Sequence, residues 1–173
     1  MNHSADRIAN LADHLIRKYH TRDPEELASC LRITIMERNF KKQRGAYVVE
    51  AGNPFIFIKR NLSPYMRKMV ITHEIGHDRL HRTEAKGSCL FREFELFDMA
   101  ASRMEYEANL MAAQILLPDQ DILDYIQMGY DTQQIANAMH SDINLVALKN
   151  DILIARGHSF RRQDHNSLFL YPE

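Results

Sequence analysis

Two histidines and a glutamate stand close together in the stretch MVITHEIGHDRLH, residues 69–81. His73 and His77 are four residues apart, so on a helix their side chains project from the same face, one turn from each other. Two imidazoles placed in this way can share one zinc ion, at Zn–N distances of about 2.0–2.1 Å. Glu74 lies about 100° to one side of His73, where it can act on a water molecule without binding the ion. The stretch predicts either a hydrolytic zinc site or a core helix whose histidines are satisfied by other partners.

The helix that carries these residues is predicted to be buried on two sides. A serine followed by a proline is a start signal, and it predicts a helix from Ser63 to about Glu84. The residues within about 60° of His73 are apolar or glycine, namely Met66, Met69, Val70, Gly76 and Leu80. The opposite side of the helix is apolar as well. We therefore expect the helix to lie between a sheet and another helix, with Gly76 allowing a close backbone approach.

A catalytic zinc ion usually takes three protein ligands and keeps one position open for water, so a third ligand is needed. His81 follows in the same helix, but it lies about 12 Å from His73 along the helix axis. One ion cannot be held across that distance. We therefore expect His81 to lie beside the site, at the end of the helix, rather than among the ligands.

A second long helix, predicted from about Phe97 to Leu117, supplies a candidate for the third ligand. Small and apolar residues lie within about 60° of Glu105, namely Ala101, Ala108, Ala112 and Leu116. Glu107 is rotated about 160° from Glu105, toward Arg103. Glu105 is therefore predicted to face inward, where it needs a zinc ion or an arginine as its partner. Asn109, one turn further on, is predicted to hydrogen-bond a ligating histidine.

Helix and strand signals elsewhere predict an α+β fold with a small antiparallel sheet. We expect Ser4 to cap a first helix, and Asp23, followed by Pro24 and Glu26, to open a second helix through a capping box. Segments rich in β-branched and aromatic residues predict three strands, the last two as a hairpin, at residues 32–38, 45–50 and 54–60. The run Phe55–Ile58 is either an edge strand that binds an extended substrate or an ordinary core strand.

The chain of 173 residues is predicted to form a single domain. Its expected parts are N-terminal helices and the sheet in 1–62, zinc-site helices in 63–118, a helical subdomain in 119–157 and a tail in 158–173. Within the helical subdomain we expect helices at 119–128, 132–139 and 143–156. Cys89, in a predicted loop at 86–94, is either a plain buried thiol or a further zinc ligand. Three arginines near the C-terminus, Arg156, Arg161 and Arg162, are expected to be solvated or to contact an acidic partner.

Composition narrows the class of protein. Hydrophobic residues make up 45% of the chain and charged residues 26%, with a net charge of -1, which is typical of a soluble globular protein. This charge predicts neither nucleic-acid binding nor attraction to a membrane. No signal peptide or membrane-spanning run is found, and two cysteines are too few for a disulfide framework. We therefore expect a cytoplasmic protein.

Two other functions are compatible with parts of the sequence. Residues 132–153 resemble a helix-turn-helix, which would make the protein a DNA-binding regulator. However, His140 stands where a glycine is typical and Lys149 where an apolar residue is expected, so two amphipathic helices fit the segment better. The other alternative is a catalytically silent zinc fold that binds a partner, but a scaffold of that kind has no need of Glu74.

Two linked motifs resemble those of the ImmA/IrrE family of metallopeptidases. They are HEIGHDRLH, residues 73–81, and EYEANLMAAQILLP, residues 105–118. The hairpin that precedes the first motif is also similar to that of the family, so the resemblance covers roughly Arg32 to Pro118. Met111 departs from the pattern, because the family usually has a phenylalanine at this position.

This resemblance implies a zincin-like α+β fold with one zinc ion per chain. It places His73, His77 and Glu105 in the positions of the zinc ligands and Glu74 in the position of the catalytic base. Family members often cleave DNA-binding repressors of mobile elements or stress genes inside bacteria. The resemblance therefore implies an intracellular protein substrate, in particular a repressor encoded nearby.

Overall fold

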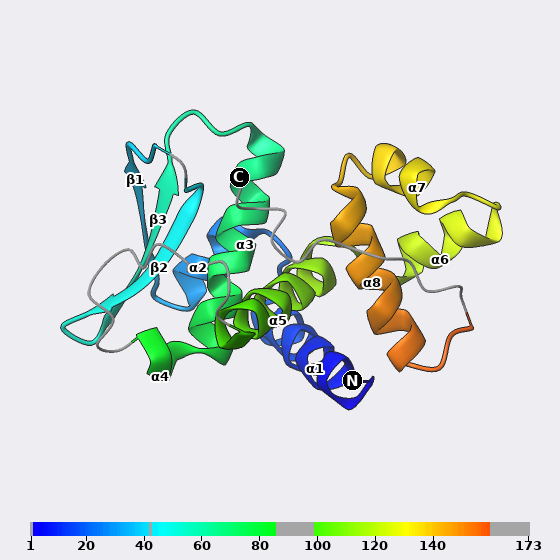
Figure 1. The fold of residues 1–173 in the computed structure, drawn as a ribbon, viewed down its shortest axis with the longest axis horizontal. Helices are drawn as coiled ribbons and strands as arrows, with labels where there is room; N and C mark the ends of the chain where they lie inside the picture. The colour runs from blue at the N-terminus through cyan, green and yellow to red at the C-terminus, as the bar shows by residue number, and fades with distance from the viewer. Residues whose placement is uncertain (1, 42, 86–98, 160–173) are drawn as a thin grey trace.

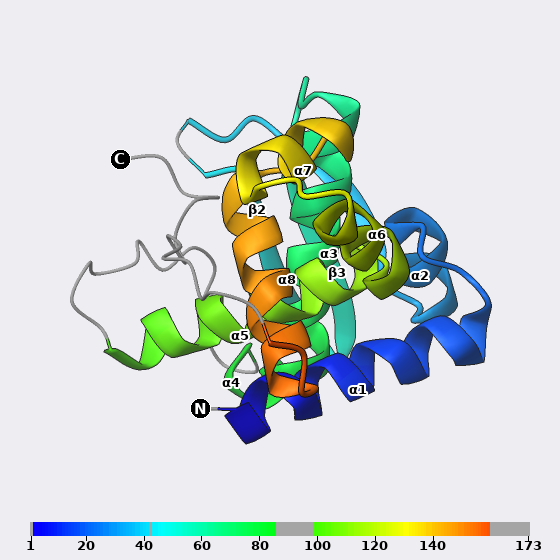
Figure 2. The ribbon, with the colours of Figure 1, turned by 90° about the vertical axis from the view of Figure 1, so that its right-hand side faces the viewer.

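A computed structural model of the chain describes residues 2–41, 43–85 and 99–159. It shows an α+β fold with a small sheet at one end and three helices at the other (Figure 1). The elements follow the order α1 (Asn2–Tyr19), α2 (Pro24–Cys30), β1 (Thr34–Arg38), β2 (Gly45–Glu50), β3 (Asn53–Lys59), α3 (Pro64–Leu80), α4 (Arg82–Ala85), α5 (Met99–Leu116), α6 (Asp119–Gln127), α7 (Thr132–Ala138) and α8 (Ile143–Ala155). In two perpendicular views α1 runs beneath α5 and α8 (Figures 1 and 2). The predicted α+β class is confirmed.

The first two helices begin differently from the prediction. α1 starts at Asn2, so Ser4 lies inside the helix and does not cap it. Asp23 does cap α2, because its Oδ1 accepts hydrogen bonds from the backbone N–H groups of Glu25 and Glu26. The reciprocal bond of a capping box is replaced, since the Glu26 carboxylate accepts a hydrogen bond from the Thr21 hydroxyl instead.

The helix α3 begins where its sequence predicts but ends earlier. The hydroxyl of Ser63 accepts a hydrogen bond from the backbone N–H of Met66, which caps the first turn. The helix stops at Leu80, and a separate short helix, α4, includes the expected end point at Glu84. The three C-terminal helices, α6 to α8, lie within their predicted ranges.

The sheet is mixed rather than purely antiparallel. Strands β2 and β3 form the predicted antiparallel hairpin, with Tyr47 opposite Ile56. Strand β1 pairs with β3 in parallel, and the strand order is β1-β3-β2. Strand β3 is the central strand, and its Ile56 and Ile58 are fully buried. A strand that is paired on both edges suits the most apolar segment of the sheet. The edge-strand interpretation of Phe55–Ile58 is therefore wrong, and the core-strand interpretation is confirmed.

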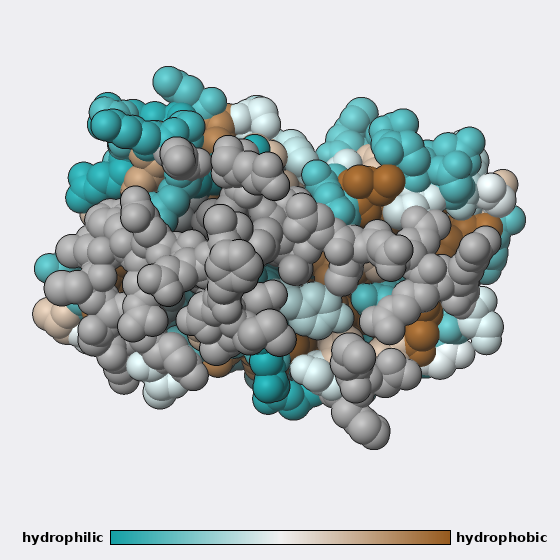
Figure 3. Space-filling view, in the orientation of Figure 1, coloured by the Kyte–Doolittle hydropathy of each residue, from teal (hydrophilic) through white to brown (hydrophobic). Residues whose placement is uncertain are grey.

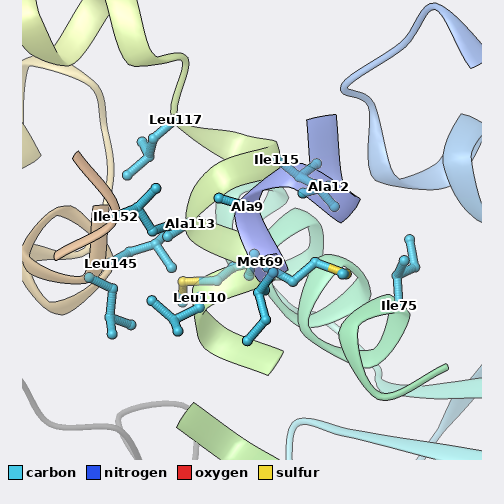
Figure 4. Packing of buried hydrophobic residues seen from close by; sticks show 14 of the residues in the cluster. Ala9, Ala12, Met69, Ile75, Leu110, Ala113, Ile115, Leu117, Leu145 and Ile152 are labelled. Atoms are coloured by element: carbon cyan, nitrogen blue, oxygen red, sulfur yellow. The ribbon is translucent and has the colours of Figure 1, made fainter. Parts of the chain in front are cut away.

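Four helices, α1, α3, α5 and α8, contribute most of the hydrophobic core (Figure 4), to which α2, β3, α6 and α7 add further residues. Its members in the close-up include Ala9, Ala12, Met69, Ile75, Leu110, Ala113, Ile115, Leu145 and Ile152. Helix α5 packs against the other three, so its position is set from several sides. The alanines that were expected to face inward, Ala108 and Ala112, are fully buried. A wide apolar contact of this kind holds α5 in one orientation relative to α3.

The helix-turn-helix alternative is disfavoured by the packing of α8. Every residue from Leu145 to Leu153 is buried, which is typical of a core helix rather than of one that lies in a DNA groove. His140, in the turn before α8, has the left-handed φ of 49° that usually favours glycine.

A buried polar network joins α8 to α1, α5 and α6. Lys149, which is fully buried, places its ammonium group against the Asp119 carboxylate and the side-chain oxygen of Gln114. Arg156 pairs with Asp119 at 2.6 Å and with Asp13 at 2.6 Å. The Arg156 side chain is therefore half-buried and paired with two carboxylates of the same chain, which corrects the prediction that it is solvated.

The described surface exposes few large apolar side chains. On the face shown in Figure 3, hydrophilic residues cover most of the upper edge, both over α3 and over α7, and hydrophobic residues reach the surface as separate spots near α8. Exposed large apolar side chains in the described part of the chain are few and are Met36, Met128, Tyr130 and Ile143. Single exposed apolar residues are ordinary in globular proteins, so we assign them no role.

Some predictions fall outside the described residues. They are the loop at 86–94 with Cys89, the predicted start of the second long helix at Phe97, and the tail beyond residue 159 with Arg161 and Arg162. Among the described helices none has the length and hydrophobicity that a membrane span requires.

The polar network predicts that Asp119→Asn destabilises the protein by about 3 kcal/mol, because the buried Lys149 ammonium loses its counter-charge. Burial alone would raise the pKa of Asp119, but the hydrogen bond and charge of Lys149 lower it to about 2, from an ordinary 3.8. The stabilising contribution is therefore complete above about pH 4 and is lost as the pH falls toward 2. Denaturant unfolding at several pH values measures both effects.

Asp121→Asn is the matched control, since Asp121 lies in the same first turn of α6 but is exposed. Equal stability of the two variants at neutral pH would contradict this role of Asp119.

Candidate metal centre

Helix α3 presents two different pairs of polar residues to two different neighbours. His73 and His77, four residues apart, face α5 and approach Glu105. Glu74 and Asp78, also four residues apart, face β2 and approach Gly45 and Tyr47 respectively. The rotation of about 100° per residue separates these two faces of the helix. The close contact of α3 with both neighbours therefore creates one polar cluster on each side.

The cluster between α3 and α5 brings together the three residues that were predicted as ligands. The Nε2 atom of His73 lies 3.1 Å from Oε2 of Glu105, and Nε2 of His77 lies 3.3 Å from Oε1 of the same carboxylate. The two Nε2 atoms are 3.0 Å apart. All three potential ligand atoms lie within 4.8 Å of one another, so a single ion can contact all of them.

The chemistry of these three side chains fits a divalent metal ion. Glu105 is fully buried, and neither of its carboxylate oxygens has a hydrogen-bond partner among the described residues. Burial would raise the pKa of Glu105, but the charge of His73 and the adjacent imidazole of His77 hold it below its usual range. Burial would lower the pKa of His73, but Glu105 raises it above its ordinary value. The site thus attracts a positive charge, which either a proton or a metal ion supplies.

Asn109 orients one of the two histidines. Its Oδ1 lies 2.7 Å from Nδ1 of His73. Because an amide oxygen only accepts hydrogen bonds, the proton of the neutral His73 ring is assigned to Nδ1. This tautomer leaves the lone pair of Nε2 directed at Glu105 and available to an ion. The structure therefore brings Asn109 to the place where the sequence predicts it.

His81 and Glu107 form a separate pair next to the cluster. Nε2 of His81 lies 3.7 Å from Oε2 of Glu107, whose Oε1 accepts a hydrogen bond from Arg103 at 3.0 Å. Glu107 pairs with Arg103, toward which the helical wheel places it, yet it is buried rather than turned to solvent. Of the two candidate glutamates, the structure brings only Glu105 to the histidines.

Glu74 is buried beside β2 and takes no part in the three-residue cluster. Its carboxylate accepts a hydrogen bond from the backbone N–H of Tyr47. A Cβ atom on Gly45 would lie 2.6 Å from its Oε1, so the strand fits against Glu74 only because residue 45 is a glycine. Burial raises the pKa of Glu74 to about 8, although the His73 charge acts in the opposite direction. A carboxyl group with a pKa near neutrality suits proton transfer.

Gly76 allows the two helices of the cluster to meet. A Cβ atom at this position would lie 2.9 Å from Cα of Ala108 and 3.0 Å from its carbonyl oxygen. These are backbone atoms, which cannot move aside as a flexible side chain can. The predicted close approach is therefore made by the α5 backbone, and it places Glu105 within reach of His73 and His77.

Two polar residues of the site were missed by the sequence analysis. Asp78 is fully buried, and its Oδ1 accepts a hydrogen bond of 2.5 Å from the hydroxyl of Tyr47. Asp78 could have been found from its spacing, because it lies four residues after Glu74 and therefore shares a helix face with it. For Tyr47 the local sequence carries no such signal, since its partner lies 31 positions further along the chain.

A helix with the HExxH pattern, packed on a sheet and facing a glutamate of a later helix, is typical of a metallopeptidase. Residues 28–149 match the peptidase family described as the IrrE N-terminal-like domain, and the chain belongs to this family. The resemblance seen in the sequence is thereby confirmed. The matched range includes α3, the sheet and α5, and thus all the residues of both clusters.

Two related proteins agree with this assignment. The chain is 34% identical over 130 residues to an "Uncharacterized immunity region protein 2" of Bacillus phage phi105, and the alignment covers 75% of this chain and 80% of the relative. It is 25% identical over 132 residues to "Metallopeptidase ImmA" of Bacillus subtilis (strain 168), with 75% of each chain covered. Family membership and the His-His-Glu cluster together support a metal-dependent peptidase.

The contact at Gly76 predicts an effect of unusual sign for Gly76→Ala. In a helix this change ordinarily stabilises by roughly 0.5–1 kcal/mol. Here we expect destabilisation by about 1–3 kcal/mol, because the added methyl group meets the α5 backbone. Metal affinity should fall as well, since α5 carries Glu105. Unfolding of the metal-free protein and a metal titration measure these changes, and a stabilised variant would contradict the packing described.

Proposed function

We propose that the protein is a zinc-dependent endopeptidase that cleaves an intracellular protein. The observation that carries this proposal is the convergence of His73, His77 and Glu105 on one point, with the buried carboxyl group of Glu74 on the adjacent helix face. Two imidazoles and one carboxylate form the ligand set of many catalytic zinc sites, which keep a fourth position open. One ion per chain is expected.

In the proposed reaction Glu74 is the general base. The zinc ion, when bound, would supply a Lewis acid that polarises the peptide carbonyl and makes water more acidic. Glu74 would take a proton from the attacking water and deliver it to the amine that leaves. Its buried position and hydrogen bond to the Tyr47 backbone support this role, because both hold the carboxyl group at a fixed place.

The substrate is proposed to lie along β2. This strand is at the edge of the sheet in the described part of the chain, since β3 pairs with it on one side only. Glu74 stands next to this strand through Gly45 and Tyr47. An extended peptide that pairs with the edge would therefore pass close to the proposed base. Strand β2 thus takes the place that the sequence analysis considered for Phe55–Ile58.

The proposed class of substrate is a DNA-binding transcriptional repressor of a mobile element or stress operon, encoded nearby. Two observations support it. One relative is named as an immunity region protein of a phage, and another as a metallopeptidase. The ImmA/IrrE family, which the sequence resembles, also contains members that act on such repressors. A catalytically silent protein that only binds its partner is the alternative function.

The ligand assignment predicts about one zinc ion per chain in the purified protein. His73→Ala and Glu105→Ala should lose most of the metal, because each removes one of three ligands. Glu107→Ala is the control, since Glu107 lies on the same helix and pairs with Arg103 instead. Elemental analysis by mass spectrometry gives the ratio. Metal retained by Glu105→Ala and lost by Glu107→Ala would show that the assignment is wrong.

The proposed base predicts that Glu74→Gln reduces cleavage by about 10²-fold or more, since general acid–base groups contribute typically about 10²–10⁴-fold. Zinc content and thermal stability should stay near those of the wild type, because the glutamine keeps the size of the side chain. The assay is incubation with the repressor encoded beside this chain, followed by mass spectrometry of the fragments. Equal relief of repression by wild type and Glu74→Gln would favour the binding alternative.

A further inference from the structure

Asp78 is a fully buried carboxylate that neither the metal cluster nor the proposed reaction uses. Its Oδ1 accepts hydrogen bonds from the Tyr47 hydroxyl at 2.5 Å and from Arg82 at 3.2 Å. Arg79 forms an ion pair with the other oxygen, Oδ2. These partners compensate the buried carboxylate for the loss of contact with water.

Helix α3 and the start of α4 contact β2 from its beginning to the turn that follows it. Arg82 also donates a hydrogen bond of 3.4 Å to the carbonyl oxygen of Gly52, in the turn that joins β2 to β3. Tyr47 stands in the middle of β2. Gly45, at its beginning, lies against Val70 and Glu74, so that a Cβ atom there would be 2.5 Å from Cγ1 of Val70. The beginning and middle of the strand are therefore in contact with α3, and the turn that follows it is in contact with α4.

Tyr47 acts at two points of this contact. Its side chain donates to Asp78, and its backbone N–H donates to Glu74, one helical turn earlier on the same face of α3. Burial and the nearby Asp78 carboxylate raise the pKa of Tyr47, so the hydroxyl keeps its proton and remains a donor. A shift of the Tyr47 side chain would move the backbone group that holds Glu74.

We propose that Asp78 and Tyr47 are positioning residues, which fix β2 on α3 and thereby hold the Glu74 carboxylate in the orientation that proton transfer requires. This inference rests on the proposed function for its effect on catalysis. Neither residue contacts the three predicted zinc ligands in the described interactions, so the pair acts on the base and not on the metal. Small displacements of a reacting group matter, since a shift of about 1 Å can reduce a rate by about 10²-fold.

The kinetic test uses Tyr47→Phe, which removes the hydroxyl and keeps the ring and the backbone. With the repressor as substrate we expect kcat to fall by about 10-fold to 100-fold, with KM and zinc content unchanged. Tyr65→Phe is the matched control, because it also removes the hydroxyl of a half-buried tyrosine. The Tyr65 hydroxyl accepts a hydrogen bond from the backbone N–H of Asp142, and it has no link to Glu74. An equal kcat for both variants would overturn the proposal.

A double-mutant cycle shows whether Tyr47 acts through the base. In the Glu74→Gln background, Tyr47→Phe should cause no further loss of kcat, because the group it positions is already gone. Losses that multiply would mean that Tyr47 contributes independently, and would overturn the proposal. Asp78→Asn keeps an acceptor for the Tyr47 hydroxyl, so it should retain more activity than Asp78→Ala.

A readout without substrate separates this inference from the proposed function. Hydrogen exchange of the residue 47 amide, followed by NMR in the metal-free protein, reports the bond to Glu74 directly. Exchange should accelerate in Tyr47→Phe and in Asp78→Ala, and stay as in the wild type in Tyr65→Phe. If the wild type does not cleave the repressor and this pattern of amide exchange is nevertheless found, the positioning of Glu74 is supported and the proposed function fails. Unchanged exchange in Tyr47→Phe would refute the positioning even in an active peptidase.

Discussion

The burial of the Glu105 carboxylate between two imidazoles is the constraint on which the site depends. Within the described residues its two oxygens have no hydrogen-bond donor, and its side chain is completely shielded from water. A charge in that position costs several kcal/mol unless an opposite charge lies beside it. His73 and His77 supply the two nitrogen atoms around which a cation can sit. An ion bound there would therefore also stabilise the pairing of α3 with α5.

The rest of the fold keeps these two helices together at backbone contact. Gly76 removes the side chain that would hold them apart, and Ala108 presents its backbone at that point. At the other end of α5, Gln114 donates hydrogen bonds to Asp13 at 2.7 Å and to Asp119 at 3.0 Å, which anchors the helix to α1 and to the start of α6. The sheet covers the other polar face of α3 through β2. One polar face of α3 therefore carries the predicted metal ligands, and the other carries the proposed base.

Much of this arrangement is predictable from local periodicity. Residues three and four apart on a helix share a face, which is sufficient to group His73 with His77 and to select Glu105 over Glu107. Strand order depends on contacts between distant segments. The parallel pairing of β1 with β3 was therefore not predicted, and the sequence left Phe55–Ile58 open between an edge strand and a core strand. The same limit applies to buried polar partners from separate elements, such as Tyr47 with Asp78 and Arg156 with Asp13.

The most direct test of the account is a crystal structure of the zinc-loaded protein with anomalous diffraction measured at the zinc edge. The account predicts one strong anomalous peak, in contact with Nε2 of His73, Nε2 of His77 and the carboxylate of Glu105, at about 2.0–2.2 Å from each. It also predicts that Glu74 lies near the ion without contacting it. A peak between His81 and Glu107, or a Glu105 carboxylate paired with an arginine at an empty site, would contradict the central claim.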